Sequence, residues 1–97
     1  MTERKNDLSR AKRMEMLLQT QLAPLTLEIA DESSKHAGHA GARPGGETHY
    51  HVHLVSKSFE GLTRVARQRL VYNALREEFD TGLHALALDL KTPAETR

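Results

Sequence analysis

Polar and apolar side chains alternate most clearly from Glu47 to Ser56, in the sequence ETHYHVHLVS. Successive side chains of a β-strand point to opposite faces, so alternation predicts a strand with one buried face. The apolar face carries Tyr50, Val52 and Leu54, and the opposite face carries His49, His51 and His53. We expect these three histidines to form a solvent-facing polar stripe, with no carboxylate or thiol obviously placed to complete a metal site with them.

Two further strands are predicted on either side of this segment. Apolar and polar residues alternate over residues 25–30 and again over residues 86–90, where Thr92-Pro93 ends the pattern. Residues 56–61 are turn-like and are expected to contain one helical turn. The three strands together predict a single sheet with one apolar face.

Two amphipathic helices are predicted to cover that face. The first spans about residues 4–22 and is stopped by Pro24, and the second runs from its N-cap Thr63 to about Asp80, before Gly82. In the first helix the apolar positions are Leu8, Ala11, Met14, Leu18 and Leu22, and basic residues cover much of the rest: Arg4, Lys5, Arg10, Lys12 and Arg13. The element order predicts an α+β fold, a two-layer αββααβ domain with a three-stranded sheet covered by helices.

Composition limits the classes of function. A chain of 97 residues is expected to form one domain, residues 1–97, and the absence of cysteine removes disulfides, zinc fingers and self-contained iron–sulfur sites. Fourteen Lys and Arg against 13 Asp and Glu give no global basic excess for nucleic acid. No apolar run approaches a membrane span and no targeting segment is evident, so we expect a cytoplasmic protein with no membrane partner. No nucleophile–base pair or phosphate loop has motif spacing, so no enzyme activity is predicted.

Four segments, in this order and spacing, resemble the BolA family: DESSKHAGH (31–39), GETHYHV (46–52), VSKSFEGLTRVARQRLVY (55–72) and HALALDLKTPAE (84–95). The resemblance implies a variant of the class II KH fold. It also implies partnership with a monothiol glutaredoxin and a [2Fe–2S] cluster shared with that partner and glutathione. Two positions depart from the family pattern. The family's Arg-His-Arg is Arg67-Gln68-Arg69 here, and Thr96 and Arg97 stand where many members have an aromatic residue.

The candidate cluster ligands are histidines. Without cysteine the chain binds no such cluster alone, but imidazole can complete a site whose thiolates come from elsewhere. The resemblance implies His84, at the start of the third strand, as the main ligand. We expect the second from the Gly-rich loop over residues 31–46, predicted to be mobile: His36 or His39, with His49 at its far end as a further candidate.

A second function remains open, because some members of the family are implied to bind DNA as transcriptional regulators of stress response and morphology. The candidate contacts to nucleic acid or to an acidic partner are Lys57, Arg64, Arg67 and Arg69. The Gly-x-x-Gly loop of nucleic-acid-binding KH domains is replaced here by Gly61-Leu62-Thr63-Arg64. The free chain is expected to be a monomer or a weak homodimer.

Overall fold

The computed structural model describes residues 8–32 and 49–96 of the chain. The helices and strands, in chain order, are α1 (Arg10–Leu22), β1 (Thr26–Asp31), β2 (His49–Val55), η3 (Lys57–Phe59), α2 (Arg64–Ala74), α3 (Arg76–Asp80), β3 (Ala85–Lys91) and η4 (Pro93–Thr96). This confirms the predicted order of elements and the α+β class.

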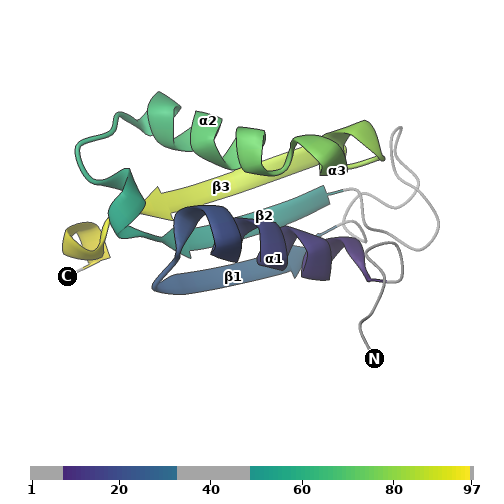
Figure 1. Ribbon diagram of the computed structural model, residues 1–97, viewed down its shortest axis with the longest axis horizontal. Helices are drawn as coiled ribbons and strands as arrows, with labels where there is room; N and C mark the ends of the chain where they lie inside the picture. The colour runs from purple at the N-terminus through teal and green to yellow at the C-terminus, as the bar shows by residue number, and fades with distance from the viewer. Residues whose placement is uncertain (1–7, 33–48, 97) are drawn as a thin grey trace.

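The three strands form one sheet in the order β1-β2-β3. β1 pairs antiparallel with β2, and β2 pairs parallel with β3, so α2 and α3 form the crossover between the parallel strands. His49 lies opposite Ala85 in this register, which places the beginnings of β2 and β3 side by side (Figure 1). Any side chain at the start of either strand therefore lies near the start of the other.

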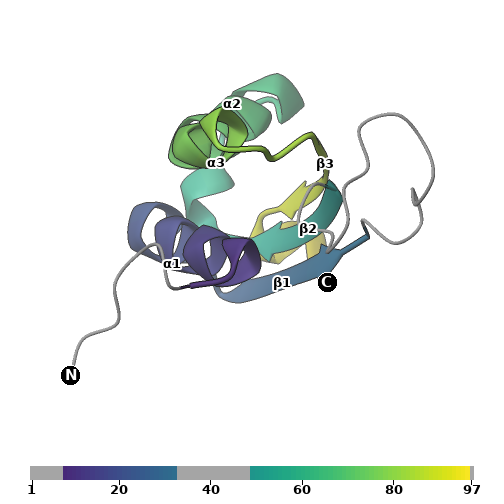
Figure 2. The same ribbon diagram turned by 90° about the vertical axis from the view of Figure 1, so that its right-hand side faces the viewer.

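All three α-helices lie on one side of the sheet, as the turned view shows (Figure 2). The core lies between the two layers and consists of Met14, Leu18, Leu22, Tyr50, Val52, Leu54, Phe59, Val71, Ala74, Leu75 and Leu83. Burial of these apolar surfaces is the main force that holds the helices on the sheet. None of the helices within the described ranges is long and apolar enough to cross a membrane.

Strand β2 has the buried apolar face that the sequence predicts. Tyr50, Val52 and Leu54 are buried, and His51 is exposed. The prediction of a uniform solvent-facing histidine stripe is wrong for His49, which is only 9% exposed and lies against the ring of His84. His53 is half-buried.

The first helix is shorter than predicted. Ser9 has an extended backbone, and its side chain accepts a hydrogen bond from the Lys12 N–H. Ser9 is therefore the N-cap, and the helix begins at Arg10. Arg10 does not lie on the remainder of the helix with the other basic residues, as predicted: it is 8% exposed and shares the buried face with Met14. Their spacing of four residues puts them on one side of the helix.

The second helix is interrupted where continuity was predicted. Thr63 is its N-cap, as expected, and accepts a hydrogen bond from the Ala66 N–H. The backbone leaves helical geometry at Leu75, so α3 follows as a separate short helix before Gly82. Two boundaries of the first strand also differ: Leu25 lies outside it and is exposed, while Asp31, assigned to the loop, pairs with Tyr50 in the sheet.

Candidate functional site

Two histidines meet at the point where the parallel strands begin. His49 is the first residue of β2, and His84 immediately precedes β3. Their ring centroids are 5.4 Å apart, and the ring planes are tilted by 43°. The contact follows from the sheet register, which pairs His49 with Ala85. The fold therefore brings together the predicted main ligand and one of the three candidates for the second.

The backbone before His84 is fixed by its neighbours. Leu83 is buried in the core, and its N–H donates to the Glu78 carbonyl at 2.8 Å. Gly82 has φ of 125°, a conformation that costs little only for glycine. The chain thus leaves α3, turns at Gly82, buries Leu83 and then presents an exposed His84 beside the buried His49.

The pair has the chemistry and spacing of two ligands to one metal. Two imidazoles that share a tetrahedral metal at bond lengths of roughly 2.0–2.1 Å have ring centres about 5 Å apart, close to the separation seen here. Within residues 8–32 and 49–96, no three His, Asp or Glu side chains are grouped to hold a metal ion. Among the described residues, His49 and His84 therefore form a pair of potential ligands without a third one beside them.

Three further histidines were considered from the sequence: the candidate ligands His36 and His39, and His53 of the polar stripe. His36 and His39 lie outside the described residues. His53 lies on the face of the sheet opposite the helices, where its Nδ1 is 2.7 Å from Oδ2 of Asp89. The parallel register places Asp89 directly opposite His53, but among the described residues this pair has no third ligand that would complete a metal site.

One of the four candidate basic contacts, Arg67, is partly buried. Arg67 is used within the fold: it pairs with Glu95 at 2.6 Å and donates to the carbonyls of Leu62 and Leu90. The hydrogen bond from Arg67, followed by one from the Thr92 N–H, lowers the pKa of Glu95 to about 2.

A hollow of about 350 Å³ beside β3 gathers part of the predicted basic set. It is lined by both Arg64 and Arg67 together with Lys91, but not by Lys57 or Arg69, which are exposed elsewhere. Asp89 and Glu95 line it as well, so acidic groups offset much of its positive charge. The hollow thus combines basic and acidic side chains.

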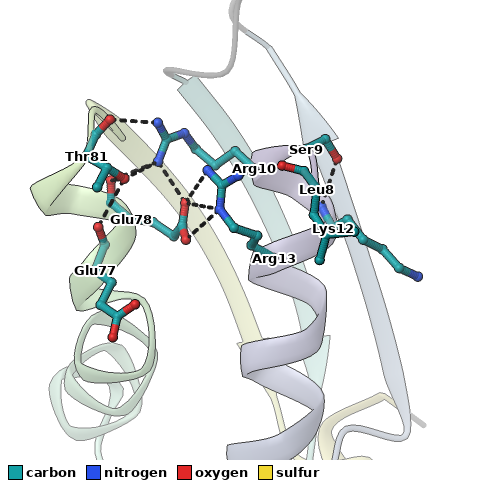
Figure 3. A network of polar contacts seen from close by, with 8 residues as sticks. All are labelled: Leu8, Ser9, Arg10, Lys12, Arg13, Glu77, Glu78 and Thr81. Atoms are coloured by element: carbon teal, nitrogen blue, oxygen red, sulfur yellow. Dashed lines mark hydrogen bonds and ion pairs between the residues drawn. The ribbon is translucent and has the colours of Figure 1, made fainter. Parts of the chain in front are cut away.

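A buried ionic network escaped the sequence-based prediction (Figure 3). Glu78 is 2% exposed and accepts hydrogen bonds from both Arg10 and Arg13 of α1. Two features of the sequence pointed to this network. Arg10 continues the four-residue spacing of the buried helix face, and the consecutive residues Glu77 and Glu78 must point in different directions. The packing of α1 against α3 brings the arginines to the carboxylate, and this packing could not be predicted from the sequence.

Comparison with known proteins identifies the family. The family model for BolA-like protein matches residues 18–95. The chain is 56% identical over 90 residues to Protein BOLA1, chloroplastic, of Arabidopsis thaliana, an alignment that covers 91% of this chain and 56% of that protein. The chain belongs to the BolA-like family, and it spans little more than half the length of that relative.

Solved structures agree with this assignment. The structure of BolA1 from Arabidopsis thaliana superposes with a TM-score of 0.82 at 50% identity, covering 93% of this chain and 99% of that one. The BolA domain of SufE1 from Arabidopsis thaliana also gives a TM-score of 0.82, at 44% identity, with 91% and 96% covered. The α+β architecture described above is therefore that of BolA domains.

Proposed function

We propose that this chain is a non-enzymatic iron–sulfur trafficking or iron-regulation protein that binds a monothiol glutaredoxin and shares a [2Fe–2S] cluster with it. The observation that carries the proposal is the contact between His49 and His84 at the start of the parallel strands. Membership of the BolA-like family supports the choice of partner.

The composition of the chain determines which molecule supplies which cluster ligands in this proposal. Iron–sulfur clusters are held by thiolates, and this chain has no cysteine, so the thiolates come from the glutaredoxin and glutathione. The cluster is cargo that the partner delivers. His84 and His49 supply two imidazoles to one iron, which raises the reduction potential relative to an all-thiolate cluster.

The exposure of the two side chains suggests separate roles. His84 is exposed and is available to a cluster that arrives from solvent with its partner, while His49 is buried beside it. His49 is preferred as second ligand because its ring already lies against that of His84. His36 and His39 remain the competing second ligands, and single substitutions distinguish the three.

The DNA-binding alternative has weaker support. The formal net charge is +1, and Arg67 is committed to Glu95 and to backbone carbonyls. DNA binding would lose affinity steeply as salt rises, because phosphate contacts release counterions. A complex bridged by a cluster depends instead on the presence of the cluster, so parallel salt titrations with DNA and with loaded glutaredoxin separate the two functions.

The proposal is tested by titrating a cluster-loaded monothiol glutaredoxin dimer with this chain, followed by visible absorption and circular dichroism. The wild type is expected to produce a new spectrum that saturates at one chain per glutaredoxin. His84→Ala is expected to abolish the change, whereas His51→Ala, an exposed histidine on the same strand as His49, leaves it intact. An unchanged spectrum with wild type would reject cluster sharing.

A further inference from the structure

Arg10 of α1 reaches the end of α3 and holds the segment that leads to His84 (Figure 3). Its Nη1 donates to Oε1 of Glu78 at 2.8 Å, to the Glu78 carbonyl at 2.9 Å and to Oγ1 of Thr81 at 3.0 Å. Its Nη2 donates to the Thr81 carbonyl at 2.9 Å. One planar guanidinium thus binds both the last turn of α3 and the residue that follows it.

The Glu78 carbonyl is the point where these bonds converge. It accepts from Arg10, from the Thr81 N–H at 3.2 Å and from the Leu83 N–H at 2.8 Å. Leu83 is buried, and the next residue is His84. The backbone from Glu78 to Leu83 is therefore tied at both ends, and Arg10 holds its middle through Thr81.

Arg13 binds the same Glu78 carboxylate as Arg10, but it also bonds a different part of the chain. Its Nε lies 3.0 Å from Oε2 of Glu78 and its Nη2 lies 3.0 Å from Oε1. Its Nη1 donates to the Leu8 carbonyl, in the direction of the N-terminus of α1 and not of Thr81. The two arginines share a partner and a helix, and Arg10 also donates to the backbone carbonyls of Glu78 and Thr81.

We propose that Arg10 is a positioning residue for His84: it fixes the α3–β3 connection so that the His84 ring stays against His49. Groups that orient metal ligands without touching the metal matter because a ligand pair binds only when both members hold the required geometry. The relevance of this positioning to a cluster rests on the function proposed above, but the positioning itself is a property of the free protein.

The test compares Arg10→Gln and Arg10→Lys with Arg13→Gln as the matched control. Lysine keeps a positive charge beside Glu78 but lacks the planar fork that bonds Glu78 and Thr81 together, so it serves if Arg10→Gln does not fold. The first readout is the nuclear Overhauser effect between the His49 and His84 rings in the free protein. The second is affinity for the cluster on loaded glutaredoxin, and urea unfolding reports stability for each variant.

Both Arg10 variants are expected to lose the ring-to-ring effect and to bind the cluster roughly 10–100-fold more weakly, the range for removing groups that orient metal ligands. Arg13→Gln is expected to lose stability while keeping the ring contact. Persistence of the ring contact in both Arg10 variants would overturn the proposal. If wild type fails to take a cluster, the ring contact still decides the role of Arg10, so the two proposals fail separately.

Discussion

His49 and His84 lie with their ring centroids 5.4 Å apart because the parallel pairing of β2 and β3 sets both residues at the same end of the sheet. One ring is buried and the other is exposed. A partner molecule can therefore reach His84 from solvent and find a second imidazole already beside it. This relationship makes His49 a specific candidate that substitution can test.

His49→Ala is expected to weaken the cluster-bridged complex with loaded glutaredoxin nearly as much as His84→Ala, because each variant leaves one imidazole of the pair. The measurement is the amplitude of the visible circular dichroism change at saturating protein. His36→Ala and His39→Ala provide the comparison. Loss of the signal in either loop variant, with a normal signal in His49→Ala, would move the second ligand to the loop.

Glu78→Gln is expected to destabilise the protein by about 3–5 kcal/mol, because removing one partner of a buried ion pair leaves charge without compensation. Both Arg10 and Arg13 would lose their carboxylate. Urea unfolding measures the difference. The matched control is Glu77→Gln, which changes the adjacent exposed residue and should alter stability by no more than about 0.5 kcal/mol. Equal effects of the two substitutions would contradict the network as described.

Gly82→Ala is expected to cost about 1–3 kcal/mol, since its φ of 125° strains any residue with a Cβ. It should also displace His84, two residues further on. Gly61→Ala is the control, because Gly61 likewise has positive φ, 77°, but lies in the turn after η3. Stability loss in both variants, with weaker cluster binding only in Gly82→Ala, is the predicted result. Wild-type behaviour of Gly82→Ala would show that this turn does not constrain the site.

Glu95→Gln is expected to lower stability near neutral pH but not in strong acid. The hydrogen bond from Arg67, followed by that from the Thr92 N–H, lowers the pKa of Glu95 from 4.5 to about 2. A folded-state pKa below the unfolded one contributes stability above about pH 4.5, and that contribution disappears as pH falls towards 2. Because Glu95 is exposed, the effect is small.

Urea midpoints of wild type and Glu95→Gln from neutral pH to about pH 2 check this expectation. The two curves should approach each other over the acidic part of the range. A gap of constant size at every pH would mean that the carboxylate charge is not the cause.

Local patterns in the sequence predicted the elements well. The alternation around Val52 and the Thr63 N-cap both depend on neighbouring residues, so the sequence alone contains the necessary information. The break at Leu75 was not predictable, because no proline or glycine marks it and the residue packs into the core. Tertiary packing decided that backbone conformation.

The site was predictable in part, for a similar reason. His84 could be placed at the start of a strand, but the choice of His49 needs the parallel register of two strands distant in the sequence. The pairing of His53 with Asp89 depends on the same register. The burial of Arg10 needs the position of α3 relative to α1. Each missed contact joins elements far apart in the chain, and residue spacing does not encode that.

Histidine ligation of the cluster is tested most directly by pulsed electron paramagnetic resonance of the reduced cluster in the complex. In this experiment the chain is labelled with nitrogen-15 at histidine only. The label separates imidazoles of this chain from nitrogen in the glutaredoxin and glutathione. Ligation by both histidines predicts strong nitrogen-15 couplings to the cluster that are lost in His84→Ala and nearly lost in His49→Ala. A complex that forms and carries the cluster without any nitrogen-15 coupling would contradict histidine ligation.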